Sequence, residues 1–363
     1  MKKLIFTLLT VFSFLITDSN AQGCVAIRNG GASCTHEFDV NDSQDSWKLN
    51  LSYRYFKSYK HFKGDEEQVE RVELGSDVRN FTNFIDLAIS KNITDKFSLT
   101  ANLPFQAIRR SSLYEHDGKS RHETSATGLG DVLIMADYWL LPRINKLNFQ
   151  VGLGVKLPTG VYNAQDYFYK NDTTYAFGPV DQSIQPGDGG TGLATQLNIQ
   201  YAMTKNFGIY GNFYYLINPR DQNGVSTTRG GAVSATNLKY RTNVMSVPDQ
   251  FLCRLGASYN ISRLTVSAGA RYEGIPSSDL IGSSTGFRRP GYIVGVEPGL
   301  SYMFKNFNFF AAVPFSLYRN RVQSVSDIQR TNDTGVFTQG DAAFSDYSLN
   351  VGFSYHFRTN KSM

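Results

Sequence analysis

Charged and aromatic side chains recur at alternate positions along many segments of this chain, a spacing that could place them on one surface in contact with a solute. In an extended strand, residues two apart share a face. Carboxylate, ammonium and guanidinium groups could orient the polar end of a solute, and aromatic rings could stack on its apolar part. By parity we assign these candidates to one inward face: Arg54, Asp86, Asp131, Asp137, Trp139, Lys156, Tyr210, Tyr214, Arg254, Arg271 and Glu297.

The same parity places further apolar residues on that inward face, namely Phe84, Leu133, Met135, Leu216, Phe310 and Tyr318. A general water-filled pore would not need them. The charged members of the set also have a structural interpretation, because opposite charges on neighbouring strands can pair and hold a wall together. Both interpretations remain open at this stage.

Two other groupings could carry different chemistry. Ser354 and His356 lie two residues apart and superficially resemble a nucleophile and its base. No neighbouring Asp or Asn clearly completes the arrangement, so we predict no enzyme. His116 and His122 lie near acidic residues in a polar stretch, which could bind a metal weakly but is more often a solvated loop. We therefore predict neither a metal site nor a cofactor.

The elements that must position these residues are β-strands. Every second residue is apolar in Trp47–Tyr55 and Phe97–Ala107, whereas the residues between are polar and must face water. Ten further segments repeat the pattern: Phe81–Ile89, Val132–Leu140, Leu147–Leu157, Leu193–Tyr201, Phe207–Ile217, Phe251–Tyr259, Leu264–Tyr272, Tyr292–Phe304, Phe307–Leu317 and Tyr347–Phe357. Strands of about nine to thirteen residues suit a tilted crossing of a bilayer.

The joins between these segments alternate between short and long. Short joins fall near residues 92–96, 142–146, 203–206, 260–263 and 305–306. Long ones fall near 60–78, 109–127, 159–190, 218–247, 273–290 and 319–343. Membrane barrels have short periplasmic turns and long extracellular loops. The sequence thus predicts an all-β fold: a transmembrane antiparallel up-and-down β-barrel of about 12 strands, spanning residues 46–357, in the outer membrane of a Gram-negative bacterium.

Composition agrees with a barrel and excludes several other classes. Of 363 residues, 18% are charged and 13% aromatic, and beyond the N-terminus no apolar run is long enough for a spanning helix. The net charge of +5 comes from dispersed Lys and Arg, so a nucleic-acid partner has no support. Basic side chains in the long loops are instead expected to meet outer-membrane lipids.

The N-terminus resembles a secretory signal, with Lys2 and Lys3, an apolar stretch, and a small residue at Ala21 after which we expect cleavage. A lipoprotein acylated at Cys24 is the alternative. Residues 22–45 lack the repeat and form an irregular extension, either periplasmic or folded into the lumen as a plug. In an oxidising compartment, Cys24 and Cys34 are expected to form a disulfide.

The end of the chain and Cys253 fit the same fold. The last predicted strand closes on Phe357, an aromatic end of the kind read by the barrel assembly machinery, and residues 358–363 follow as a tail. Cys253 lies on the apolar face of its strand, so we expect it to face lipid or be buried.

Three short motifs carry a resemblance: Gly128-Leu129-Gly130-Asp131, Lys156-Leu157-Pro158-Thr159-Gly160, and the Gly-rich start of a strand at Gly187–Leu193. With them the chain, from about residue 47 to 357, resembles the outer-membrane family named for the meta-pathway of phenol degradation. The resemblance implies a transporter for aromatic or other hydrophobic compounds and carries over no catalytic residues. The N-terminal cysteines and the long third and fourth outer loops depart from the family.

A barrel of about twelve strands has a narrow bore, between filled small barrels and sixteen-stranded porins. With a mixed polar and aromatic lining, it predicts a channel for small hydrophobic or aromatic solutes. The alternatives are a structural or general barrel that displays its loops to a partner and, with less support, a lipid hydrolase.

Overall fold

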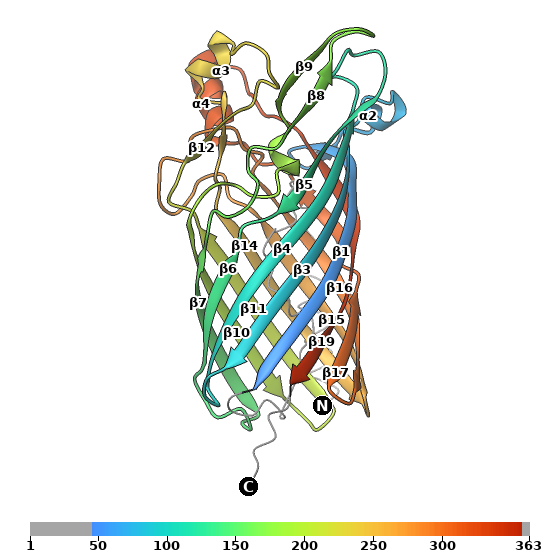
Figure 1. The fold of residues 1–363 in the computed structure, drawn as a ribbon, viewed down its shortest axis with the longest axis vertical. Helices are drawn as coiled ribbons and strands as arrows, with labels where there is room; N and C mark the ends of the chain where they lie inside the picture. The colour runs from blue at the N-terminus through green and yellow to red at the C-terminus, as the bar shows by residue number, and fades with distance from the viewer. Residues whose placement is uncertain (1–45, 358–363) are drawn as a thin grey trace, which may run out of the picture.

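The computed structural model describes residues 46–357, which form a closed antiparallel barrel (Figure 1). The wall consists of twelve strands, as the alternation predicts. They are β1 (Trp47–Lys63), β3 (Arg79–Asn92), β4 (Phe97–Ser112), β5 (His122–Leu129) continued by β6 (Leu133–Trp139), β7 (Leu147–Lys156), β10 (Gly192–Ala202), β11 (Phe207–Ile217), β14 (Gln250–Ile261), β15 (Leu264–Ile275), β16 (Gly291–Phe304), β17 (Phe307–Ala312) continued by β18 (Phe315–Asn320), and β19 (Ala342–Phe357).

Each strand pairs with the next along the chain, and β19 returns to pair with β1, from Trp47 opposite Phe357 to Phe62 opposite Ala342. This last pairing closes the sheet and leaves the barrel without a free edge. Two of the twelve wall strands are interrupted. Residues 130–132 separate β5 from β6, and Val313 and Pro314 separate β17 from β18, where proline cannot donate a ladder hydrogen bond.

The two faces of the wall differ as the alternation requires. Outward side chains such as Leu153, Leu255 and Leu300 are 62%, 63% and 51% exposed, and together they make an apolar exterior. Cys253, a free cysteine, is exposed on this face as well. A soluble monomer rarely exposes so much contiguous apolar surface, whereas the hydrocarbon of a bilayer would cover it.

The two ends of the barrel are unlike. At the turn end, β14 and β15 are joined by Ser262 and Arg263, and β16 and β17 by Lys305 and Asn306. Ser262 and Lys305 have φ near 58° and 56°, as tight hairpins require. At the loop end, β1, β4 and β19 run past the predicted limits of their strands, to Lys63, to Ser112 and from Ala342, so the wall rises above its apolar band.

The long connections at the loop end are folded and not structureless (Figure 1). They contain β2 (Glu66–Glu67), α2 (Val69–Glu73), the β8 (Gln165–Tyr169) and β9 (Tyr175–Pro179) hairpin, η1 (Gln182–Ile184), β12 (Gln222–Ser226), α3 (Ala235–Lys239), β13 (Val244–Ser246) and α4 (Val325–Thr334). A capping box between Ser324 and Asp327 begins α4, and Gly335 ends it. Within residues 46–357, no helix has the length and apolar character to cross a membrane.

Several predictions concern parts of the chain outside the described residues. These are the signal peptide over 1–21, the extension over 22–45 with its Cys24–Cys34 disulfide, and the tail over 358–363.

Candidate functional site

A ladder of polar side chains crosses five neighbouring strands on the inner face of the barrel. Gln150, Asn198, Asn212, Arg254 and Arg271 lie directly opposite one another in register from β7 to β15. Asn198 donates to Gln150 at 2.8 Å, and Asn212 donates to Asn198 at 2.6 Å. The Nε of Arg254 lies 3.3 Å from the Asn212 amide oxygen that accepts from it. Of these five residues, the alternation in the sequence predicts only Arg254 and Arg271 as candidates, because neutral amide side chains carry no distinctive signal in a sequence.

The predicted charges of this wall form a compact network. Glu297 accepts from Arg271 at 2.6 Å and from Arg254 at 3.5 Å, and Arg271 also donates to Glu273 at 2.8 and 2.9 Å. All four side chains are less than a tenth exposed. Buried charges need such pairing because each loses its hydration. The arrangement fits the structural interpretation of these charges: they brace the wall and at the same time give it a polar inner surface.

Next to the ladder lies an apolar patch on the same inner face. It is formed by buried side chains of β6, β10, β11 and β14: Leu133, Met135, Ala194, Tyr214, Leu216 and Leu252. Tyr210 lies flat against the neighbouring strands, since a Cβ at Gly256 would come within 2.5 Å of its ring and one at Gly269 within 2.7 Å of its hydroxyl. The ladder and the apolar patch share β10, β11 and β14, so polar and apolar side chains lie at successive levels of the same inner face, with Asn212 between Tyr210 and Tyr214 on β11.

The remaining predicted residues lie apart from this network. Arg54 on β1 stacks over the ring of Phe84 at 4.4 Å, and Asp86 is half-buried two residues along β3. Asp137 is 8% exposed and one of its carboxylate oxygens has no hydrogen-bond partner within residues 46–357. Trp139, half-buried at the turn end of β6, stacks with Arg143 at 5.7 Å. The eleven predicted residues thus lie at several levels of the barrel and do not form a single site.

The three Gly-rich motifs converge on Asp131. Its carboxylate accepts from the backbone N–H groups of Gly160 and Asp188, each at 2.9 Å, and Asp188 in turn pairs with Lys156. A Cβ at Gly160 would lie 2.6 Å from the backbone of Gly130, so only glycine permits this approach. Asp131 and Lys156 therefore fasten the third long connection to the barrel wall.

That connection continues as residues 180–190, which we call the mouth loop. Nearly all of it is buried, and it packs against the inner face of β4, where the Gln106 amide donates to the Pro186 carbonyl at 2.8 Å. Gln182 donates to the Ser246 carbonyl at 2.8 Å from the other side. The mouth loop consequently crosses the barrel at its loop end.

Charged side chains hold the start of the mouth loop. Asp181 accepts two hydrogen bonds from Arg289, at 2.9 and 2.7 Å, and lies 3.5 Å from Arg110. Burial alone would raise the pKa of the Asp181 carboxyl, but Arg110 and Arg289 outweigh it and hold that pKa well below its usual range. The pKa of Glu115 is lowered in the same way, against its burial, by Arg110 and Arg229. Both carboxylates are therefore ionised at neutral pH.

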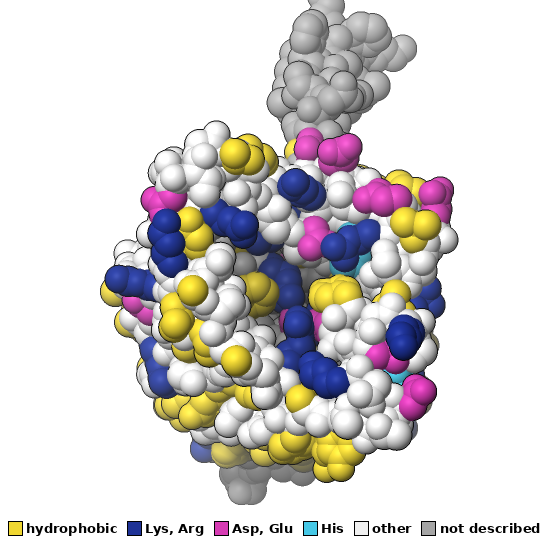
Figure 2. Space-filling model, turned by 90° about the horizontal axis from the view of Figure 1, so that it is seen from above, with side chains coloured by type: hydrophobic (Ala, Val, Ile, Leu, Met, Phe, Trp, Pro, Cys, Tyr) yellow, Lys and Arg dark blue, Asp and Glu magenta, His cyan; other side chains and the backbone are white. Residues whose placement is uncertain are grey.

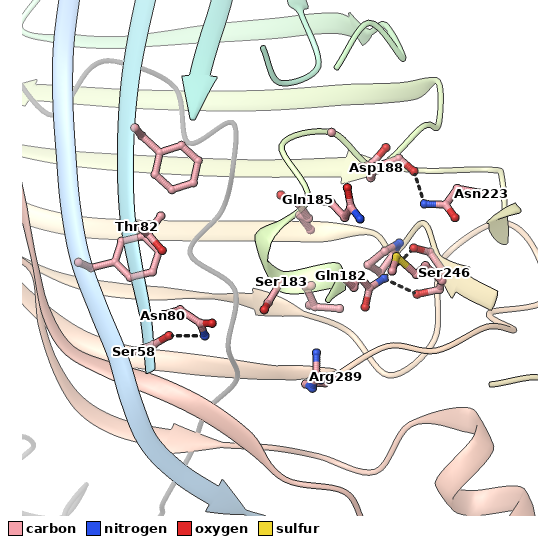
Figure 3. Close-up of a pocket in the computed structure, with 17 residues that line it drawn as sticks. Ser58, Asn80, Thr82, Gln182, Ser183, Gln185, Asp188, Asn223, Ser246 and Arg289 are labelled. Atoms are coloured by element: carbon pink, nitrogen blue, oxygen red, sulfur yellow. Dashed lines mark hydrogen bonds between the residues drawn. The ribbon is translucent and has the colours of Figure 1, made fainter. Parts of the chain in front are cut away.

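Two cavities lie on either side of this crossing. The inner chamber, on the barrel side, has a volume of about 50 Å³ and is enclosed by Ser58, Asn80 and Thr82 from β1 and β3 opposite Gln182 and Gln185 of the mouth loop (Figure 3). The vestibule, on the loop side, has a volume of about 360 Å³. Gln182, Met245 and Arg289 line both cavities, so they form the partition between them.

Among residues 46–357, the His116–His122 pair lacks the geometry of a metal site, and the Ser354–His356 pair lacks the geometry of a nucleophile with its base. The rings of His116 and His122 are tilted by 47° with centroids 5.1 Å apart, and no group of three metal-ligating side chains occurs among residues 46–357. Ser354 lies opposite Asn50 of β1 and Asn308 of β17, so no carboxylate occupies those register positions.

No protein-family model matches this sequence, and no curated protein is similar to it. The structure is similar to that of an outer membrane channel from Pseudomonas putida F1, with a TM-score of 0.58 and 12% identity over 89% of this chain and 99% of that one. The chain has the fold of an outer-membrane channel. At this identity the likeness extends to the fold alone.

Weaker likenesses also occur. The translocator domain of the autotransporter NalP from Neisseria meningitidis has a TM-score of 0.45 and 11% identity, over 88% of this chain and 90% of that one. The toluene transporter TodX of Pseudomonas putida has a TM-score of 0.42 and 12% identity, over 94% and 99%. Neither value supports an argument about this chain. Membership of the family named for the meta-pathway of phenol degradation stays a prediction.

Proposed function

We propose that this protein is a channel in the outer membrane of a Gram-negative bacterium that admits small hydrophobic or aromatic compounds. One observation carries the proposal: a closed barrel with an apolar exterior is crossed at its loop end by a buried, anchored mouth loop. A wide aqueous pore would leave that end open. The inner face, on which the buried rings of Tyr210 and Tyr214 flank the polar Asn212 along β11, suits solutes that combine an apolar body with a polar group.

The size of the inner chamber adds a requirement for movement. A cavity of about 50 Å³ holds a few water molecules, whereas a cavity that binds benzene has roughly 150 Å³. A solute on the path from the vestibule therefore passes only when the mouth loop or its partners shift. We infer a gated channel, oriented with its short turns in the periplasm, that is inserted by the barrel assembly machinery and surrounded by outer-membrane lipids.

Planar-bilayer recording tests this function. The purified protein should show small, infrequent ionic currents, and aromatic solutes should reduce those currents in a saturable manner. Large, continuous currents that aromatic solutes leave unchanged would instead identify a general pore.

A second candidate function has one specific observation in its favour. The β8–β9 hairpin projects from the loop end and exposes Tyr167, Tyr175 and Phe177, with the first two rings 4.8 Å apart (Figure 1). Exposed aromatic clusters often mark interaction surfaces. If the barrel mainly displays this hairpin to a partner, deleting residues 165–179 should abolish partner binding and leave solute uptake intact.

A further inference from the structure

The vestibule has a chemistry that differs from that of the barrel below it. Four arginines from three separate connections line it: Arg229, Arg288, Arg289 and Arg321. Seen from above, Lys and Arg side chains gather around the central hollow of this face (Figure 2). A solute that enters from outside meets these guanidinium groups before it reaches the partition at Arg289.

Three carboxylates also line the vestibule, and each is already paired with an arginine. The pairs are Asp181 with Arg289 at 2.7 Å, Asp327 with Arg321 at 3.1 Å, and Asp341 with Arg71 at 3.1 Å and His61 at 2.6 Å. Both partners of Asp341 therefore lie outside the cavity. The two arginines that have no partner within the lining are held from outside it, Arg229 by Glu115 at 2.7 Å and Arg288 by Asp279 at 2.6 Å, so the vestibule is lined by four guanidinium groups whose charges are already balanced.

Two of the arginines retain donors that the folded chain does not use. Arg288 and Arg321 are 2% and 3% exposed, and the Nε of each is buried with no hydrogen-bond partner within residues 46–357. Leaving a buried donor unsatisfied costs about 1–3 kcal/mol. Charge-assisted bonds to a carboxylate are the strongest that a guanidinium group forms, so an anion is the ligand best suited to this wall.

Aromatic rings stand beside the arginines. Arg289 stacks over the ring of Phe287 at 4.7 Å, and Arg229 lies 5.9 Å from the centre of the Tyr114 ring. Both rings line the vestibule together with Met245. A flat apolar ligand can stack on these rings while its charged group meets the guanidinium groups. With about 360 Å³, the vestibule is within the ordinary range for sites that hold small molecules.

We propose that the vestibule binds aromatic carboxylates, so that the solutes this channel selects are anionic aromatic acids and not neutral hydrocarbons. This inference rests on the proposed channel function, whose substrate class it defines. A phosphate group, free or on a lipid, shares the oxyanion chemistry but lacks the ring that Phe287 and Tyr114 would contact.

Calorimetric titration of the purified full-length protein in detergent tests the inference with three probes: benzoate, benzyl alcohol and inorganic phosphate. Benzoate should bind at least tenfold more tightly than either of the others, and added salt should weaken its binding. Equal affinity for benzyl alcohol would overturn the role of charge. Equal affinity for phosphate would overturn the role of the ring and indicate a plain oxyanion site.

Variants locate the site. Arg321→Gln and Arg229→Gln should each weaken benzoate binding tenfold or more, whereas Arg109→Gln, which removes an equal charge from an exposed arginine outside the vestibule, should leave it unchanged. Arg229→Gln is the safer of the two for folding, because Glu115 keeps two hydrogen bonds of 2.9 Å from Arg110. Folded variants of Arg321 and Arg229 that bind benzoate as the parent does would overturn the proposal.

Uptake into proteoliposomes separates this inference from the channel function. Entry of benzyl alcohol through the protein, with no binding of benzoate, would refute the vestibule site and leave the channel intact. Binding of benzoate that depends on Arg321, with no entry of any aromatic solute, would refute the channel and leave the site.

Discussion

Replacing Asp181 with asparagine should release the mouth loop and open the barrel. Asp181 is 7% exposed and accepts hydrogen bonds from Arg289 at 2.9 and 2.7 Å and from the Ser183 hydroxyl at 2.7 Å, with Arg110 close by. The substitution keeps the shape of the side chain but removes its charge from beside Arg289 and Arg110, and also from the field of Arg229; Glu115 still pairs with Arg110 and Arg229. Removing one partner of a buried ion pair typically costs about 3–5 kcal/mol.

That cost falls on the closed state, because residues around Asp181 regain water once the mouth loop moves. At about 1.4 kcal/mol for each factor of ten, a loss of about 3 kcal/mol raises the ratio of open to closed channels on the order of a hundredfold. Lowering the pH would not reproduce the loss of the Asp181 charge that this variant produces. The pKa of Asp181 lies well below its usual range, so the carboxylate keeps its charge, and its stabilising effect, until the pH falls below the ordinary range for an aspartate.

Single-channel recording in planar bilayers measures the effect as the frequency of open events. Asp172→Asn is the matched control, since it makes the same chemical change at the exposed tip of the β8–β9 hairpin in the same connection. Retarded migration of unheated protein in electrophoresis would show that both variants form barrels. An Asp181→Asn barrel that opens no more often than the control would refute the role of the mouth loop as the gate.

Three further changes test other parts of the structure. Gly256→Val should push the Tyr210 ring into the lumen and slow solute uptake, because a Cβ at position 256 would lie 2.5 Å from that ring. Uptake equal to that of the parent protein would show that Tyr210 does not border the path of the solute. Burial tends to raise the pKa of Asp341, but its hydrogen bond from His61 outweighs burial and lowers that pKa to about 2. The ionised Asp341 therefore stabilises the fold above pH 4, and this stabilisation is lost as the pH approaches 2. Asp341→Asn should therefore lower the free energy of unfolding in urea by about 2 kcal/mol at pH 7 and hardly at all near pH 2; an equal loss at both would contradict this assignment. Leu153→Arg, on the outer face, should cost about 2–4 kcal/mol of stability in lipid if it faces the bilayer core, and a neutral result would place that face elsewhere.

The alternation along the chain is sufficient to predict the barrel wall, because a strand between lipid and lumen must repeat every two residues. All twelve predicted segments fall on strands. Most errors lie at the strand ends, but β5 lies largely in a predicted long connection, and the break at Val313 and Pro314 falls within the predicted segment Phe307–Leu317. β1 runs eight residues past Tyr55 to Lys63, since nothing in a two-residue repeat marks where the strand leaves the membrane.

The mouth could not be predicted in the same way. Asp181 and Arg289 are 108 positions apart, and each lies in a long, irregular connection where no periodicity relates one residue to another. The Gly-rich motifs did contain a usable signal. Glycines that recur beside Asp131 and Gly160 indicate close backbone contact, and the structure shows that they fasten the third connection to the wall. Sequence reasoning identified these residues and left open whether they contact solute or build the wall.

Uptake into proteoliposomes tests the central claim most directly. Benzoate and arabinose have similar masses, but only benzoate combines a flat apolar ring with a charge. If the barrel is a gated channel for small aromatic solutes, benzoate should enter with saturable kinetics, faster in Asp181→Asn than in the parent, and arabinose should be largely excluded from the parent protein. Entry of arabinose into parent proteoliposomes at the same rate as benzoate, without saturation, would contradict the account and establish a general pore.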